Sequence, residues 1–387
     1  MLAGVGIGVA IGRSHNNNSP SSTTVSSTKK VRRCTKKRQK LGLCTATSTT
    51  TGTGSLSAPP PGVLAPFTLT DLPSKMGLST GTQLWDDSLP QMDTDIAGMA
   101  SAGAHWIRTA VHWSDVEPTS AGQDDWSKAD RIVEDGQKDH VNIIFDITSS
   151  PDWAGGSAAG EFSNNPQLYA NFAAKVAGRY KDTVRVYELG NEPNHTHYAG
   201  HPDAATYATV LKLSYKQMKA ADPNAFVLVG GIGGVKDSGG DIDPVTFVKG
   251  LYTNGAKGSF DGLAYHPYTY PETPTQEIVS GNRGWSRMLA VRAVMVQNGD
   301  AAKPVWVTEF GAPTSGSGSV SPTAQAAIMK DAFNLWKTYS WGGAICWFSY
   351  QDRGVDSSSH KGSFGLFDTS GGRKPSYTTF LDLSKGA

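Results

Sequence analysis

Beyond about residue 70, short hydrophobic runs alternate regularly with longer segments in which hydrophobic residues recur at helical spacing. The short runs are rich in β-branched and aromatic residues and are almost continuously apolar, which is typical of strands covered on both faces. We expect eight strands, at residues 75–81, 105–113, 141–149, 184–190, 226–231, 260–268, 304–311 and 342–350.

The segments between these runs predict helices that cross from one strand to the next. Residues 165–180, 203–220 and 323–339 have helical period, and each begins near a proline, serine, threonine or aspartate. Linking segments of roughly 20 to 40 residues suit right-handed strand–helix–strand crossovers. Eight such units predict an α/β protein with a closed (β/α)8 TIM barrel, and an open doubly wound sheet is the alternative.

The charge distribution separates a tail from this barrel. Residues 1–70 contain no Asp or Glu and nine of the 35 Lys and Arg residues, so the remainder has 26 basic residues against all 34 acidic ones. Eight of the nine lie between Lys29 and Lys40, in Ser/Thr-rich sequence that cannot build a core. We therefore expect a disordered tail over residues 13–66 and one barrel domain over residues 67–387.

The tail also bears on partners. No aromatic residue interleaves its charges, so we expect no nucleic-acid partner. The basic run can contact an anionic wall polymer or a membrane surface, or it can be a solvated linker. We expect the barrel itself to be a monomer.

Residues 1–12 form an apolar segment, but a helix needs about 20 residues to cross a bilayer. Its length is that of a signal-peptide core, although the positive charges follow it instead of preceding it. We expect a remnant of a signal or anchor, and hence a secreted or envelope-associated protein; a plain tail is the alternative. Cys34 and Cys44 are close enough in sequence to pair in an oxidising compartment. Cys346 lies in an apolar run, which predicts a buried thiol.

Two glutamates stand at predicted strand ends, where a (β/α)8 barrel builds its site. Glu192 follows residues 184–190, between Asn191 and Pro193, and Glu309 lies at the end of residues 304–311. Either glutamate alone could form a salt bridge or cap a helix. Cleavage of a glycosidic bond needs such a pair, because one carboxyl group protonates the departing oxygen while the other attacks the anomeric carbon or activates water.

Three further strand ends carry candidate polar groups. Arg108 and His112 are four positions apart on one predicted strand, so their side chains point to the same face. A buried arginine can hold a carboxylate in its ionised form. Asp146 could bond a sugar hydroxyl or Arg108. His266 and Tyr268 fall on one face of their strand, where a tyrosine hydroxyl could orient a carboxylate.

Residues 342–350 add an aromatic candidate, Trp347, whose indole could form an apolar floor for a sugar ring.

Two other motifs resemble ligand-binding patterns but lack a required residue. The segment "GGIGGVK" from Gly230 to Lys236 lacks the last glycine of a dinucleotide-binding pattern, so we interpret it as a turn after the fifth strand. The histidines of "HTHYAGH", residues 195–201, lack a partner at ligand spacing, so we expect neither a metal nor a cofactor.

The motifs "ELGNEPN", "YHPY" and "VTEFG", with the tryptophan of the eighth strand, resemble the clan of retaining (β/α)8 glycoside hydrolases. Within that clan, the chain looks most like the cellulase-like families 5 and 39. The resemblance implies that Glu192 is the acid/base, that Glu309 is the nucleophile and that Asn191 contacts the sugar 2-hydroxyl.

The resemblance further implies that Arg108, His266, Tyr268 and Trp347 line the sugar site. One departure is that family 5 members often have a histidine near the end of the third strand, where this chain has Asp146. The expected activity is retaining hydrolysis of a poly- or oligosaccharide, with Glu192 protonated at the start. A transglycosylase with the same intermediate and a non-catalytic glycan-binding barrel are the alternatives.

Overall fold

A computed structural model of the protein describes residues 72, 74–156, 165–281, 284–354 and 362–386. The predictions for residues 1–66 lie outside these ranges, including those on export, on contacts of the tail and on pairing of Cys34 with Cys44.

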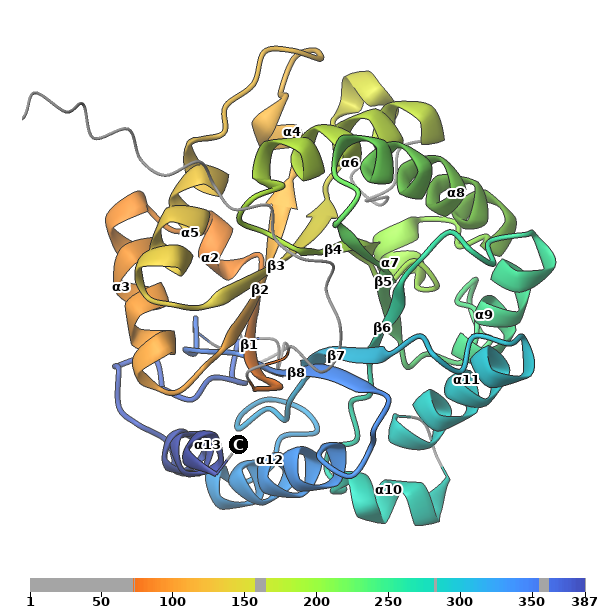
Figure 1. The fold of residues 1–387 in the computed structure, drawn as a ribbon. Helices are drawn as coiled ribbons and strands as arrows, with labels where there is room; N and C mark the ends of the chain where they lie inside the picture. The colour runs from red at the N-terminus through yellow and green to blue at the C-terminus, as the bar shows by residue number, and fades with distance from the viewer. Residues whose placement is uncertain (1–71, 73, 157–164, 282–283, 355–361, 387) are drawn as a thin grey trace, which may run out of the picture. The chain divides into compact units, whose positions relative to one another are not determined.

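Eight parallel strands close into a barrel in chain order (Figure 1). They are β1 (Met76–Gly81), β2 (Trp106–His112), β3 (Asn142–Thr148), β4 (Val186–Asn191), β5 (Phe226–Gly233), β6 (Gly262–His266), β7 (Val305–Phe310) and β8 (Gly342–Phe348). The predicted (β/α)8 barrel is therefore confirmed, because an open sheet would leave β1 and β8 unpaired.

The helices of the described residues surround this barrel (Figure 1). They are α2 (Gln83–Asp86), α3 (Leu89–Ser101), α4 (Trp113–Val116), α5 (Ser127–Lys138), the 3-10 turn η2 (Asp152–Ala154), α6 (Pro166–Tyr180), α7 (Thr196–Ala199), α8 (Ala204–Ala221), α9 (Pro244–Thr253), α10 (Pro274–Ser280), α11 (Trp285–Gln297), α12 (Pro322–Trp336) and α13 (Pro375–Lys385). The start signals of α6, α8 and α12 act as caps, since Asn165, Asp203 and Ser321 accept backbone N–H groups of their first turns.

Two hydrophobic clusters fill the barrel domain. The larger lies between the strands and the helices, and the smaller follows the inward positions of the strands. The smaller cluster consists of Trp106, Ile144, Val186, Leu228, Ala264, Trp306, Ala344 and Cys346. Side chains two positions apart on a strand share a face, so the next inward layer contains Arg108, Asp146, Glu188, His266 and Thr308. The barrel thus changes from an apolar to a polar filling toward its carboxyl end.

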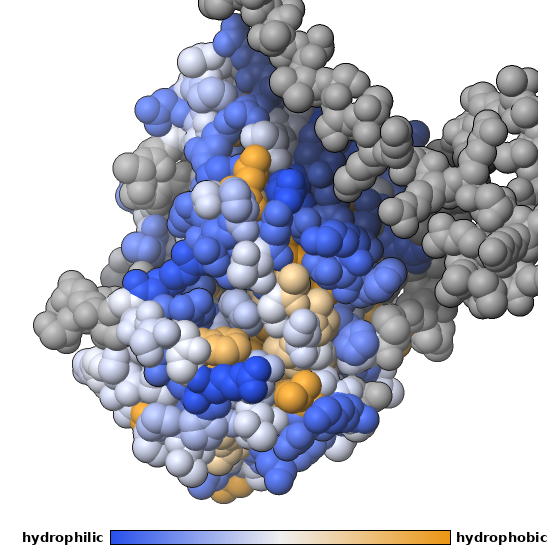
Figure 2. All heavy atoms as spheres, turned by 90° about the vertical axis from the view of Figure 1, so that its left-hand side faces the viewer, coloured by the Kyte–Doolittle hydropathy of each residue, from blue (hydrophilic) through white to orange (hydrophobic). Residues whose placement is uncertain are grey.

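Hydrophilic residues predominate on the surface over α3 and α5, with hydrophobic residues scattered singly (Figure 2). Within the described residues, no helix combines the length and the apolar character needed to cross a membrane.

Candidate active site

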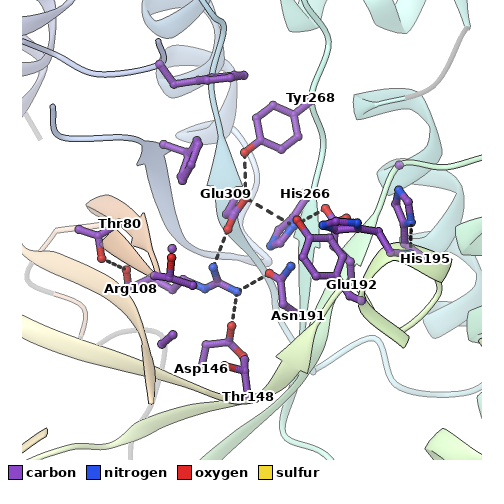
Figure 3. Close-up of a pocket in the computed structure, with 18 of the residues that line it drawn as sticks. Thr80, Arg108, Asp146, Thr148, Asn191, Glu192, His195, His266, Tyr268 and Glu309 are labelled. Carbon is purple, nitrogen blue, oxygen red and sulfur yellow. Dashed lines mark hydrogen bonds and ion pairs between the residues drawn. The ribbon is translucent and has the colours of Figure 1, made fainter. Parts of the chain in front are cut away.

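A cavity of about 730 Å³ opens at the carboxyl ends of the strands. This volume is within the range of small-molecule sites. Seven of the nine predicted site residues line it and converge on one another (Figure 3): Arg108, Asp146, Asn191, Glu192, His266, Tyr268 and Glu309.

Arg108 is the centre of the hydrogen-bond network at the floor of this cavity. Its Nη1 donates to Glu309 Oε1 at 2.5 Å, and its Nη2 donates to Asp146 Oδ2 and to Asn191 Oδ1, both at 2.8 Å. Glu188 accepts from Nη2 at 3.0 Å and from Nε at 3.4 Å. Burial alone would lower the pKa of Arg108, but the charges of Glu188, Asp146 and Glu309 raise it well above its ordinary value. The guanidinium is therefore a fixed positive charge beneath the cavity.

Glu309, on β7, is the carboxylate that this charge holds. Its Oε2 accepts a hydrogen bond of 2.9 Å from the hydroxyl of Tyr268. Burial alone would raise the pKa of Glu309, but the charges of His266 and Arg108, with the hydrogen bonds from Tyr268 and Arg108, keep it below its ordinary value. Glu309 is accordingly an ionised carboxylate at the wall of the cavity.

Glu192 reaches the cavity from the turn after β4. Its φ of 42° lies in the left-handed region that residues other than glycine rarely adopt. Its backbone N–H donates to Gly231 O on β5 at 2.9 Å, which ties the turn to the neighbouring strand. Its Oε1 lies 2.9 Å from His266 Nδ1.

His266 joins the two glutamates. The same Nδ1 lies 3.8 Å from Glu309 Oε2, while Nε2 lies 3.2 Å from Thr308 Oγ1. Since 2.9 Å and 3.8 Å are measured from one nitrogen, Glu192 Oε1 and Glu309 Oε2 lie at most about 6.7 Å apart, the sum of the two. Burial and the charge of Arg108 would lower the pKa of His266, but Glu309 and Glu192 outweigh them and raise it.

Two predicted site residues do not line the cavity. His112 ends β2 where the chain enters α4, and its ring stacks on Trp85 of α2 at 5.5 Å between centroids. Trp347 is fully buried, and its Nε1 donates to Phe364 O at 3.0 Å. Because inward positions alternate along β8, Phe348 lines the cavity instead of Trp347. The structure therefore places neither His112 nor Trp347 at the cavity where their predicted substrate contacts would be made.

Glu188 was not among the predicted site residues. This side chain is completely buried on β4 and accepts from Gly231 N at 2.8 Å in addition to Arg108. A signal was present, since an acidic residue within an apolar strand is buried only when it is paired. Glu188 lies beneath the cavity. The residues that line the cavity without having been predicted lacked such a signal, and they include Thr80, Thr148, Tyr198, Tyr270, Phe348 and Phe364.

Two predictions concern metals and thiols. His195 and His197 line the cavity, and His195 Nδ1 accepts from the backbone N–H of His197 at 3.0 Å. Across the ranges that the structure describes, no three His, Cys, Asp or Glu side chains are grouped to hold a metal ion. Cys346 is a buried thiol inside the barrel, as predicted, and burial raises its pKa.

Known structures share this fold. A family 39 glycoside hydrolase from Bacteroides cellulosilyticus WH2 is 22% identical with a TM-score of 0.65, over 80% of this chain and 63% of that protein. A monomeric β-xylosidase from Caulobacter crescentus CB15 is 21% identical with a TM-score of 0.59, over 80% and 68%. A GH5_18 protein from Streptomyces cattleya in complex with GlcNAc is 15% identical with a TM-score of 0.59, over 80% and 79%.

These likenesses confirm the resemblance to the barrels of families 39 and 5 at the level of the fold. The chain spans just under two thirds of the length of the Bacteroides protein. No protein-family model matches the sequence, and a search of curated proteins found no match.

Proposed function

We propose that the protein is a retaining O-glycoside hydrolase in which Glu309 is the nucleophile and Glu192 the acid/base. The observation that carries this proposal is the convergence of both carboxyl groups on His266 Nδ1. Carboxyl groups of retaining enzymes lie about 5 to 5.5 Å apart, whereas inverting enzymes need roughly 6.5 to 9.5 Å to admit a water molecule. Because Glu192 Oε1 and Glu309 Oε2 lie at most about 6.7 Å apart, nearly all of the inverting range is too long for them, which supports the retaining arrangement.

The reaction would proceed in two displacements. Glu309 attacks the anomeric carbon while Glu192 donates its proton to the departing glycosidic oxygen, which leaves a sugar covalently bound to Glu309. Glu192, now a carboxylate, takes a proton from water, and the resulting oxygen attacks the anomeric carbon and releases Glu309. In this proposal Asn191 contacts the sugar 2-hydroxyl, and Arg108 fixes its side chain by donating to Oδ1 at 2.8 Å.

The surroundings of the two glutamates support these roles. Arg108 and Tyr268 hold Glu309 in the ionised form that a nucleophile needs. Glu192 instead lies 2.9 Å from His266 Nδ1, a ring nitrogen through which a proton can be exchanged with a carboxyl group. Two carboxyl groups with different surroundings can take the two roles at one pH.

The substrate class follows from the cavity and from the likenesses. Aromatic side chains lie beside polar ones in the lining, as sugars with apolar faces and many hydroxyls require. The similar proteins include a β-xylosidase and a GH5_18 protein in complex with Manβ1-4GlcNAc. We therefore propose β-linked oligosaccharides, with β-xylosides, β-glucosides and β-mannosides as first substrates.

The test is hydrolysis of aryl β-glycosides and oligosaccharides, with the first anomer of the product identified by proton NMR. We expect retained configuration, loss of activity in Glu309→Gln, and in Glu192→Gln a fall in turnover of about 10²- to 10⁴-fold that azide partly restores. Glu134→Gln, on the exposed face of α5, is the control.

Inverted products would exclude the proposed mechanism. An inactive wild type that still binds glycans would favour the glycan-binding barrel. Longer oligosaccharides at high acceptor concentration would identify transglycosylation.

A further inference from the structure

The first four residues of the glycine-rich segment 230–236 belong to strand β5, and the next two line the cavity. Gly230, Gly231 and Gly233 all lie within β5, which ends at Gly233. Asn191 on β4 is in register with Gly231, so these glycines run alongside the turn that carries Glu192. Their arrangement corrects the interpretation of the segment as a turn.

Gly233 faces the carboxyl group of Glu192. A β-carbon at this position would lie 2.9 Å from Glu192 Cδ, closer than real β-carbon contacts, and 3.1 Å from Oε2, tighter than most of them. The backbone at Gly233 does not require glycine, because its φ is outside the left-handed region. The absent side chain therefore matters as the space that the Glu192 carboxyl group occupies.

Asn194 fixes the backbone of Gly233 relative to the same turn. Its buried side chain donates from Nδ2 to Gly233 O and accepts at Oδ1 from Gly233 N, both at 2.9 Å. A side-chain amide thus pairs with both peptide groups of Gly233, as a neighbouring strand would. Because Asn194 follows Glu192 by two positions, the turn and the strand end cannot shift independently.

We propose that Gly233 is a positioning residue for Glu192, with Asn194 fixing the backbone of the pair. This inference rests on the proposed role of Glu192 as acid/base. A methyl group at position 233 would move the Glu192 carboxyl group away from His266 Nδ1 and from the departing oxygen. The Glu192 carboxyl group is at the end of a flexible side chain that is 14% exposed, so its displacement needs little rearrangement of the core.

The test is the Gly233→Ala variant, assayed by kcat/KM on glycosides with good and poor leaving groups. A dinitrophenyl leaving group departs without a proton, whereas an alkyl or sugar leaving group needs one from the acid. We expect kcat/KM to fall at least about tenfold more on the poor leaving group than on the dinitrophenyl glycoside. A merely structural defect would lower both equally, which would overturn the inference.

Gly178→Ala is the matched control, because a β-carbon there would make only an ordinary contact of 3.5 Å with Ala221. We expect it to leave both substrates unaffected. In a double-mutant cycle, adding Gly233→Ala to Glu192→Gln should cause little further loss, since both act through one carboxyl group. Additive losses would contradict the proposal, as would a Gly233→Ala protein that cannot fold.

A wild type without activity on any glycoside would instead refute the proposed function. An active wild type with an unselective Gly233→Ala would refute only the positioning role. The two failures are therefore distinguishable.

Discussion

Glu309 and Glu192 face the same cavity, but the groups around them differ. Glu309 is held at both oxygens, by the guanidinium of Arg108 and by the hydroxyl of Tyr268. Glu192 has no such pair of fixed donors within the described contacts, and it lies between His266 and the bare backbone of Gly233. The first setting stabilises a negative charge, and the second leaves room for a proton to arrive and leave.

This difference shows how one fold can give two carboxyl groups different chemistry. The glutamates come from β7 and from the turn after β4, so each has its own neighbours on separate strands. His266, on β6, lies within 3.8 Å of both through its Nδ1. The comparison predicts that changes near Glu309 mainly affect charge, whereas changes near Glu192 mainly affect proton transfer.

The largest expected effect is on the Glu309 side, from Arg108→Met. This change leaves the buried carboxylates Asp146 and Glu188 without their counter-charge and releases Glu309. Loss of one partner from a buried ion pair costs roughly 3–5 kcal/mol, so we expect the free energy of unfolding to fall by about that amount. Urea denaturation measures this fall, and activity should be undetectable.

The matched control is Arg179→Met, which removes an ion pair with Asp130 whose side chains are 39% and 34% exposed. An exposed pair contributes less than about 1 kcal/mol, so this variant should remain near wild-type stability. If Arg108→Met were as stable as Arg179→Met, the buried carboxyl groups would not depend on the guanidinium.

An intermediate effect is expected from Tyr268→Phe, which removes the hydrogen bond to Glu309 Oε2. Hydrogen bonds to charged groups contribute about 1.5–3 kcal/mol, so kcat/KM should fall roughly tenfold to hundredfold. Loss of this donor raises the pKa of Glu309, which must be ionised to act as the proposed nucleophile. The acidic limb of the pH profile should therefore move to higher pH.

Tyr215→Phe is the control for this change, since it removes a hydrogen bond of 2.9 Å to Asp261 on the outer side of the barrel. It should leave the pH profile unchanged. An unshifted acidic limb in Tyr268→Phe would show that the hydroxyl does not maintain the charge of Glu309.

The barrel was predictable because each strand is a short apolar run bounded by polar residues. The position of both glutamates at one end of the barrel was predictable, because each follows or ends an apolar run and parallel strands bring their carboxyl ends together. The orientation of single side chains was harder to predict from the sequence. Trp347 and Phe348 are adjacent aromatics, and only the barrel interior filled by Cys346 decides which of them faces the cavity.

Two other features depend on contacts between distant segments. His112 is on the same face of β2 as Arg108 by alternation, yet the strand ends at His112 and its ring stacks on Trp85. The proposed role of Gly233 could not be predicted for a similar reason. No local sequence pattern shows that the side chain of Glu192, from the turn after β4, fills the space beside this glycine. Alternation along a strand predicts a face, and packing determines whether that face is part of the site.

The smallest expected effect concerns His266, the group that links both glutamates. Its pKa is raised in the folded protein, so its stabilising contribution is complete below the unfolded pKa of about 6.5. That contribution is lost as pH rises through the folded pKa. We expect the free energy of unfolding to decline over this window in the wild type and to decline less in His266→Asn.

The groups that face His266 set the sign of this prediction. Burial and Arg108 oppose the imidazolium, while Glu309 and Glu192 favour it and outweigh them. His140→Asn, at an exposed position with a φ of 57° that asparagine tolerates, is the control and should keep the wild-type slope. Equal slopes in the wild type and His266→Asn would mean that the glutamates do not hold the charge of His266, and the link between the two halves of the site would then be steric rather than electrostatic.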